Sequence, residues 1–202
     1  SRTSFFGRIL KWLERQIYDQ AHLVVGVTKG ICRHIQERTD TDVILIRNGI
    51  DTNKFFPLKG ESRDEKFVVL FHGTISRYQN VDLLLEYAKH LKRTRTKGVT
   101  LRIIGDGPKA DTLTRSIEEY DLGENVEYIG FVDFDDIPNH LNRADVGISP
   151  RLDGIVNKTA FPVKVYECLG CGLPVVVTPK GEAGRYVERH QVGVQHGNED
   201  IK

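Results

Sequence analysis

The residues best suited to chemistry lie in a short predicted helix that opens at Pro162. Proline is favourable in a first helical turn, because the N–H groups there have no partner within the helix. Those N–H groups and the helix dipole attract anions. Lys164 lies in the same turn, where the dipole alone disfavours a cation. A phosphate bound in this turn would explain the placement of Lys164; the alternative is a lysine that points to solvent.

Glu167 follows Lys164 by three residues, so both side chains project from one side of the helix. A carboxylate beside phosphates would not contact them, but it accepts hydrogen bonds from sugar hydroxyls such as the 2′- and 3′-OH of a ribose. A surface ion pair with Lys164 is the alternative, and it would contribute little energy. We therefore predict a nucleotide site in which Lys164 contacts phosphate and Glu167 contacts ribose.

A second candidate is the loop that follows the predicted strand Phe67–His72. Gly73 would let the backbone approach a ligand closely. Arg77 is the basic side chain of this loop and would form a forked contact with a phosphate, unless it is simply solvated. Asn80 is a favourable N-cap for the helix that follows.

The stretch Gly105-Asp-Gly107-Pro-Lys-Ala110 matches the loosest form of a dinucleotide-binding fingerprint. It follows the second strand of its domain instead of the first, and Glu127 falls inside the next strand instead of at its end. A tight turn with Pro108 at the first helical position is the interpretation we prefer.

The pair Cys168 and Cys171 forms a C-x-x-C at the end of a helix. No second cysteine pair completes a zinc site, and redox pairs usually lie at a helix start. We expect two small residues that pack a helix against the sheet, and we expect no metal site.

Apolar runs rich in β-branched residues alternate with helix-like stretches in the larger part of the chain. The predicted strands are Phe67–His72, Thr100–Ile104, Val126–Ile129, Val146–Ser149, Pro174–Thr178 and Val192–Gln195. The predicted helices between them are Asn80–Lys92, Pro108–Tyr120, Asp135–Asn142, Pro162–Gly170 and Glu182–His190. This alternation predicts an α/β fold, a Rossmann-like three-layer domain with a mostly parallel sheet whose ligands lie at the carboxyl ends of strands.

Before this domain, the sequence predicts one amphipathic helix and part of another α/β unit. Apolar residues at spacings of three and four begin at Phe5 and end at Ile17. A helix on a membrane surface would look similar, but Glu14 and Asp19 dilute its basic face, so we expect it to pack against protein. Two short apolar runs, Leu23–Val27 and Val43–Ile46, flank a helical stretch from Lys29 to Arg38.

The totals exclude several classes of protein. The 202 residues suffice for one domain and a piece of another, and 39% hydrophobic with 28% charged residues is typical of soluble globular proteins. A formal net charge of +1 argues against nucleic-acid binding. No apolar run reaches the ~20 residues of a membrane span, and three cysteines are too few for a disulfide scaffold. We expect a cytoplasmic location and, from the absence of Met, a piece of a longer protein.

Ordered blocks of this sequence resemble the retaining glycosyltransferases of family 4, which have the GT-B fold. From Ala21 onward these are HLVVGVTKGICRHI, VILIRNGIDTNKFFP, VVLFHGTISRYQNVDLLL, LRIIGDGP, VEYIGFVDFDDIPNHLNRADVGISP and AFPVKVYECLGCGLPVVVT. The resemblance implies that residues 1–52 end an incomplete N-terminal, acceptor-side domain. It further implies a linker at 53–66 and a C-terminal domain for nucleotide-sugar binding at 67–202.

The resemblance also implies specific site residues, and the chain departs from some of them. In the family's Glu-x7-Glu element the second Glu binds the donor ribose and corresponds to Glu167, whereas the first corresponds to Thr159. The family's Arg and Lys for the diphosphate fall near Thr74 and Gln79, so Lys164 takes the main phosphate role with help from Arg77. Lys164 and Glu167 are thus the predicted catalytic residues. The predicted nucleotide-sugar contacts are Gly73, Arg77, Phe131, Val132, Thr159, Ala160, Phe161, Pro162, Val163, Lys164 and Glu167.

The implied function is transfer of a hexose, such as mannose, glucose or N-acetylhexosamine, from UDP or GDP to a glycan or lipid-linked acceptor. No cofactor is expected besides the nucleoside-diphosphate sugar, which is the donor substrate. Peripheral attachment to the inner face of a membrane is compatible with a lipid-linked acceptor. Two alternatives remain open: a non-catalytic domain that binds nucleotide sugars, and an NAD-dependent oxidoreductase that uses Gly105-Asp-Gly107.

Overall fold

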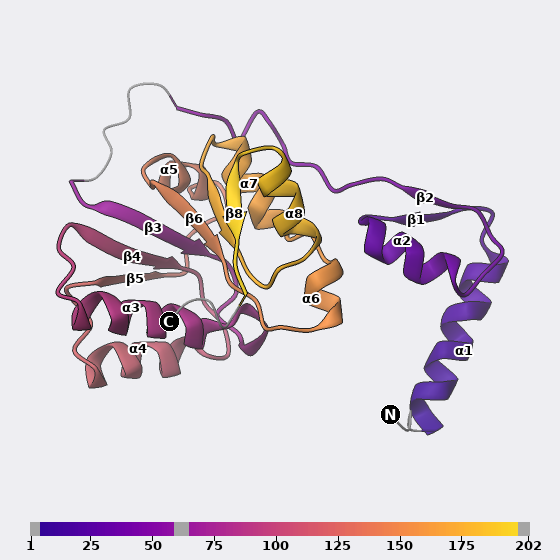
Figure 1. Cartoon of the computed structure of the whole chain (residues 1–202), viewed down its shortest axis with the longest axis horizontal. Coiled ribbons are helices and arrows are strands. Elements are labelled where there is room, and N and C mark those ends of the chain that lie inside the picture. The colour runs from indigo at the N-terminus through magenta and orange to yellow at the C-terminus, as the bar shows by residue number, and fades with distance from the viewer. Residues whose placement is uncertain (1–4, 59–64, 198–202) are drawn as a thin grey trace.

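The computed structural model describes residues 5–58 and 65–197, which form two α/β units side by side (Figure 1). The N-terminal unit holds α1 (Phe5–Gln20), β1 (Val24–Gly26), α2 (Lys29–Gln36) and β2 (Val43–Leu45). Strands β1 and β2 pair in parallel, and the hydroxyl of Thr28 caps α2 by accepting a hydrogen bond from the Ile31 amide at 3.2 Å. Both short strands and the helix between them follow the sequence prediction.

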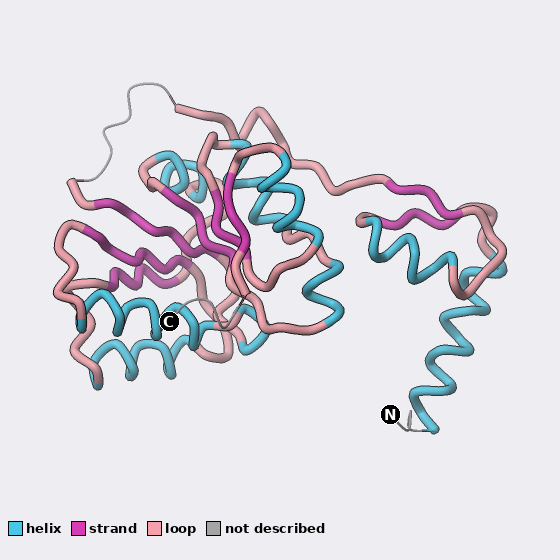
Figure 2. The backbone as a smooth tube through the Cα atoms, viewed as in Figure 1, coloured by secondary structure: helices cyan, strands magenta, loops and turns pink. Residues whose placement is uncertain are grey.

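The C-terminal unit is a parallel sheet between two layers of helices (Figure 2). Its strands are β3 (Phe67–His72), β4 (Val99–Ile104), β5 (Val126–Gly130), β6 (Val146–Ser149), β7 (Val175–Val177) and β8 (Gly193–Gln195). Its helices are η1 (Arg77–Gln79), α3 (Val81–Arg93), α4 (Ala110–Glu119), α5 (Ile137–Asn142), α6 (Ile155–Thr159), α7 (Val163–Gly170) and α8 (Glu182–Arg189). The predicted α/β class with its mostly parallel sheet is confirmed.

Strand order decides where a ligand can enter this sheet. The order is β5-β4-β3-β6-β7-β8 and every pairing is parallel, so successive strands run outward from β3 in one direction and then from β6 in the other. At such a reversal the loops after neighbouring strands diverge and leave a crevice at the carboxyl ends. The candidate site is therefore expected beyond His72, the last residue of β3.

Two apolar cores hold the helices on the sheet. In β3, Val68 and Leu70 face the core formed with α5, α7 and α8, whereas Val69 and Phe71 face the core formed with α3 and α4. Each fully buried aliphatic side chain of this size contributes about 1.5–3 kcal/mol. Burial on both faces explains the nearly continuous apolar run of this strand.

Glu182, the first residue of α8, connects the two units. Its carboxylate accepts hydrogen bonds from the backbone amides of Lys29 at 2.7 Å and Gly30 at 2.8 Å, in the first turn of α2. Arg47 of the N-terminal unit lies 3.5 Å from the same carboxylate. An anion at a helix N-terminus is favoured by the unpaired amides and the dipole, so Glu182 stabilises the contact between α2 and α8.

Several details differ from the sequence prediction, and one of them is helix α6, which was not predicted. Helix α1 has no buried residue in the described part of the chain, so its apolar face does not pack against protein as expected. Asn80 precedes α3 in the left-handed region (φ 47°) and makes no side-chain cap. Phe55, within the predicted linker 53–66, is 2% exposed and packs in the core, while residues 59–64 of that segment lie outside the described residues.

Candidate functional site

A cavity of about 400 Å³ opens at the carboxyl ends of β3, β4 and β5. Its wall combines the turn after β3, the turn after β4, the loop after β5 and one residue of α7. The lining residues are His72, Gly73, Thr74, Ile104, Gly105, Asp106, Phe131, Val132, Phe134, Ile137 and Glu167. Gly73, Phe131, Val132 and Glu167 were predicted from sequence as nucleotide contacts, and the fold brings these four to one cavity.

Glu167 is a buried carboxylate fixed by a histidine. Its Oε2 lies 2.8 Å from Nε2 of His72, and the two residues are 9% and 5% exposed. Burial lowers the pKa of His72, so the ring is neutral at neutral pH and its Nε2–H donates to the carboxylate of Glu167. No hydrogen bond to Oε1 is present within the described residues, which leaves this oxygen as the acceptor for a ligand hydroxyl.

Lys164 lies deeper than the sequence suggested. Its Nζ donates to Oε1 of Gln79 at 3.0 Å and lies 4.2 Å from the ring centroid of Phe71. Burial lowers the pKa of Lys164 to about 8, and the charge of Arg151 acts in the same direction. The ammonium group therefore lies at the end of β3 and makes no ion pair with Glu167, its predicted alternative partner.

Gly73 allows this approach of Lys164. Its φ is +128°, a conformation that favours glycine, and a Cβ at this position would lie 2.7 Å from Nζ of Lys164. Any side chain here would displace the ammonium group from the edge of the cavity. The glycine thus positions the cation, and its predicted contact with a ligand stays a prediction.

The two glycines of Gly105-Asp-Gly107 serve the packing of neighbouring loops. A Cβ on Gly105 would collide with the carbonyl oxygen of Gly73, and a Cβ on Gly107 would lie 2.6 Å from that of Ile75. Protein backbone therefore occupies the close approach that a dinucleotide fingerprint reserves for a pyrophosphate. Glu127 is ion-paired with Arg102 at 2.6 Å instead of lying at a strand end.

The geometry of this cavity agrees with the comparisons to known proteins. The family model described as glycosyl transferases group 1 matches residues 53–202. The chain belongs to the glycosyl transferases group 1. All six strands of the large sheet and every lining residue of the cavity fall within the matched range.

Individual relatives share the domain at moderate identity. TuaH of Bacillus subtilis (strain 168), a glycosyltransferase provisionally assigned to teichuronic acid biosynthesis, is 35% identical over 180 residues, which cover 87% of this chain and 45% of TuaH. A GDP-mannose-dependent alpha-(1-6)-phosphatidylinositol monomannoside mannosyltransferase of Mycolicibacterium smegmatis is 27% identical over 164 residues, 76% of this chain and 42% of that protein. The group 1 chain described here thus spans less than half the length of these two relatives.

Among solved structures, Anabaena Alr3699/HepE in complex with UDP superposes with a TM-score of 0.78 at 19% sequence identity. The match covers 98% of this chain and 58% of that one. At this identity the likeness concerns the fold, and it agrees with the Rossmann-like architecture of group 1 proteins.

Several predicted contacts of this group 1 chain lie away from the cavity. Arg77 is exposed in η1, with its guanidinium 5.6 Å from the ring centroid of Tyr78, and it does not line the cavity. Phe161 is buried and stacks on Tyr166 with ring centroids 4.2 Å apart. Thr159 ends α6, and Ala160 follows it as the C-cap.

Helix α7 begins close to the predicted position. Pro162 is its N-cap, with φ −64° and ψ 136°, and Val163 is its first residue. Neither residue lines the cavity described above. Their proposed contact with a diphosphate remains a prediction, as do the contacts proposed for Arg77 and for the Thr159–Phe161 segment.

Sequence reasoning missed His72 and Arg151. His72 belongs to no motif, but it is the last residue of a buried strand. A polar residue at the carboxyl end of a strand could have indicated a place where ligands bind. Arg151 follows β6, the other strand at the reversal, and its charge acts on Lys164.

The three cysteines are free thiols inside the protein. Cys32, Cys168 and Cys171 are free and buried, and burial raises the pKa of Cys171 to about 11 and that of Cys168 further. Across residues 5–58 and 65–197, no group of three or more His, Cys, Asp or Glu is arranged to hold a metal ion. Nor does any helix in this part of the chain have the length and apolarity needed to cross a bilayer.

Proposed function

We propose that this chain is the donor-binding part of a retaining glycosyltransferase. In this proposal the enzyme moves a hexose from UDP or GDP to a glycan or lipid-linked acceptor. The observation that carries the proposal is the arrangement at the end of β3: Glu167, held by His72, lines the cavity, and the ammonium group of Lys164 lies beside Gly73, which also lines it.

Groups in the cavity or beside it match each part of a nucleoside diphosphate; Lys164 is not a lining residue but lies beside Gly73, which is. Oε1 of Glu167 is available to the ribose hydroxyls, and the cation of Lys164 complements the diphosphate. Phe131 is 74% exposed and lies with Val132 in the loop after β5, where an apolar base surface can pack against them. The fold resembles that of HepE, whose structure was solved in complex with UDP, and this likeness supports nucleotide binding by this chain.

The reaction would form a bond between an acceptor hydroxyl oxygen and the anomeric carbon as the bond from that carbon to the diphosphate breaks. The acceptor proton would pass to an oxygen of the departing diphosphate, which keeps the anomeric configuration if attack and departure share one face. Lys164 would stabilise the negative charge that grows on the diphosphate. At neutral pH a lysine with a pKa of about 8 is mostly protonated and can perform this role.

The two alternatives from sequence make different predictions. An oxidoreductase would bind NAD through Gly105-Asp-Gly107, but backbone of the neighbouring loop fills that approach. A non-catalytic domain would bind nucleotide without supporting transfer, and Thr159 in place of an acidic residue is the feature that favours it. Transfer assays on the full-length protein separate this alternative from the proposal.

The test is a binding panel of UDP, GDP, ADP and NAD, measured by thermal shift and calorimetry on the 202-residue chain. UDP or GDP should raise the melting temperature, because a ligand of the native state stabilises it by mass action. Glu167→Ala should weaken binding by about 1.5–3 kcal/mol, the range for hydrogen bonds to a charged group. Glu118→Ala, on exposed α4, is the matched control and should bind normally. A chain indifferent to every nucleoside diphosphate would refute the proposal.

A further inference from the structure

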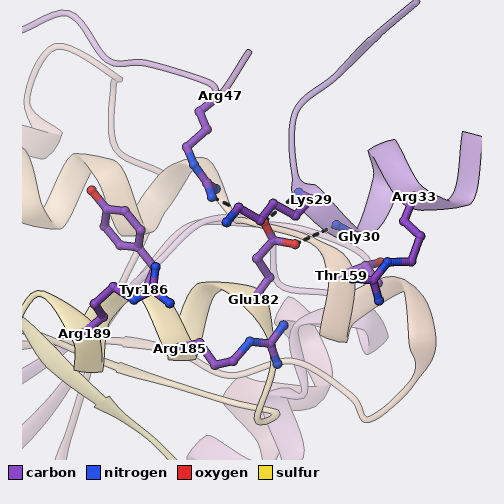
Figure 3. A pocket seen from close by; sticks show the side chains of 9 residues that line it. All are labelled: Lys29, Gly30, Arg33, Arg47, Thr159, Glu182, Arg185, Tyr186 and Arg189. Carbon is purple, nitrogen blue, oxygen red and sulfur yellow. Dashed lines mark hydrogen bonds and ion pairs between the residues drawn. The ribbon is translucent and has the colours of Figure 1, made fainter. Parts of the chain in front are cut away.

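A second cavity, of about 360 Å³, lies between the two units, where α2 meets α6 and α8 (Figure 3). Its lining residues are Lys29, Gly30, Arg33, Arg47, Thr159, Glu182, Arg185, Tyr186 and Arg189. None of them lines the cavity at the strand reversal. The two cavities thus share no lining residue, and Thr159 is the one residue of the second cavity that is also a predicted nucleotide-sugar contact.

Positive charge is concentrated in this second cavity. Five of its nine lining residues are Lys or Arg and one is acidic, although the whole chain has a formal net charge of only +1. The acidic residue, Glu182, is already bonded to the amides of Lys29 and Gly30 and to Arg47. Figure 3 shows the other cationic side chains arranged around it, from both units. One engaged carboxylate cannot neutralise five cations.

Several of these cations have no protein partner. In the described part of the chain, the side chains of Arg33, Arg185 and Arg189 make no ion pair, and Nη1 of Arg47 is buried without a hydrogen-bond acceptor. Arg185 and Arg189 are four residues apart on α8, so they lie on one face of the helix and repel each other. A cavity with this charge distribution is stabilised by an anion, and guanidinium groups match the planar, bidentate geometry of phosphate and carboxylate oxygens.

An aromatic ring lies beside the charges. Tyr186 lines the cavity, and the guanidinium of Arg47 lies 5.7 Å from the centroid of its ring. A ligand that enters the cavity therefore meets an apolar surface next to the cations, which suits an anionic group attached to a larger body better than a bare ion.

We propose that this second cavity binds the phosphate or carboxylate group of an anionic sugar substrate. This inference rests on the proposed glycosyltransferase function, because it names the chemical class of a saccharide substrate of that enzyme. Arg33, Arg185 and Arg189 would contact the oxyanion, with Arg47 reaching it through Nη1, and Tyr186 would contact the sugar ring.

The test compares two variants that each lose two exposed arginines from helices. Arg185→Ala with Arg189→Ala removes cations from the second cavity, and Arg93→Ala with Arg115→Ala, on α3 and α4, is the matched control for net charge. Calorimetry on the 202-residue chain, with and without saturating UDP, measures binding of inorganic phosphate, glucuronate and neutral glucose. The two anions distinguish a phosphate from a carboxylate as the recognised group.

We expect at least one anion to bind both in the presence and in the absence of UDP. Its affinity should fall at least tenfold in the Arg185/Arg189 variant and stay unchanged in the control, with UDP affinity the same in both variants. Each of four results would overturn the proposal. Neutral glucose could bind as tightly as the anion, or both variants could lose the same anion affinity. The anion could compete with UDP, or no anion could bind. An anion that binds as expected to a chain that ignores UDP, GDP and ADP would support this site while refuting the nucleotide proposal, so the two failures are distinguishable.

Discussion

Removal of the Glu182 carboxylate should loosen the contact between the two units. Glu182→Ala deletes two hydrogen bonds, of 2.7 Å and 2.8 Å, from the amides of Lys29 and Gly30 to a charged acceptor. Each such bond contributes about 1.5–3 kcal/mol. Water can replace the acceptor once the side chain is gone, and bonds to one group are not additive, so we expect a total loss of about 3 kcal/mol.

Hydrogen exchange measures this loss at the two amides. The first amides of a helix have no partner within it, so the protection of Lys29 and Gly30 comes from Glu182. A loss of about 3 kcal/mol corresponds to exchange about 100-fold faster at these positions. Glu182→Gln keeps one acceptor oxygen and should give an intermediate rate.

Glu118→Ala on α4 is the control, because Glu118 is exposed and lies away from the contact between the units. The free energy of unfolding of the Glu118→Ala variant should differ from that of the parent chain by no more than about 0.5 kcal/mol. If Glu182→Ala left exchange at Lys29 and Gly30 at the parent rate, the assigned role of the carboxylate at the start of α2 would be wrong.

Three further predictions concern single residues. Affinity for a nucleoside diphosphate should fall by about tenfold per pH unit above pH 8, because Lys164, with its pKa lowered to about 8, loses the charge that binds phosphate. Calorimetry from pH 7 to 9.5 checks this. The Lys164→Met variant should bind the nucleoside diphosphate more weakly, and its affinity should not depend on pH. An affinity of the parent chain that stays constant over this pH range would contradict the assignment. Gly105→Ala should lower the free energy of unfolding by about 2 kcal/mol or more in denaturant titrations, because its φ is +133° and the methyl group meets backbone. Gly123→Ala, at a position with open space, is its control and should change little. Cys168 should react with thiol reagents only after denaturation, since burial raises the pKa of its thiol, and rapid labelling of the native chain would show that it is accessible.

Local patterns predicted the elements of this fold with few errors. The six strands of the large sheet lie within one or two residues of their predicted bounds, because buried parallel strands are apolar on both faces and leave an unbroken signal. Helix α6 was missed, since five residues without a side-chain cap carry too little periodicity to be recognised. The expected protein partner of α1 is absent from the described residues. An amphipathic pattern predicts that one face of a helix is buried, but it does not show what covers that face.

For the candidate site too, some relations between residues follow from the sequence and others from the tertiary structure. Sequence by itself determined that Lys164 and Glu167 share one helix, and it placed Gly73 and the Phe131–Val132 pair directly after predicted strands. These relations are local, or they follow from the rule that ligands bind at the carboxyl ends of parallel strands.

Tertiary structure alone decided which groups act together. It paired His72 with Glu167 across 95 residues, turned Lys164 toward Gly73 instead of Glu167, and brought Glu182 to amides that lie 152 and 153 residues away. It also gathered arginines from α2 and α8 around one cavity. Charge and hydrogen-bond partners depend on distances of a few ångströms, and those distances are fixed by packing between elements that no short-range pattern connects.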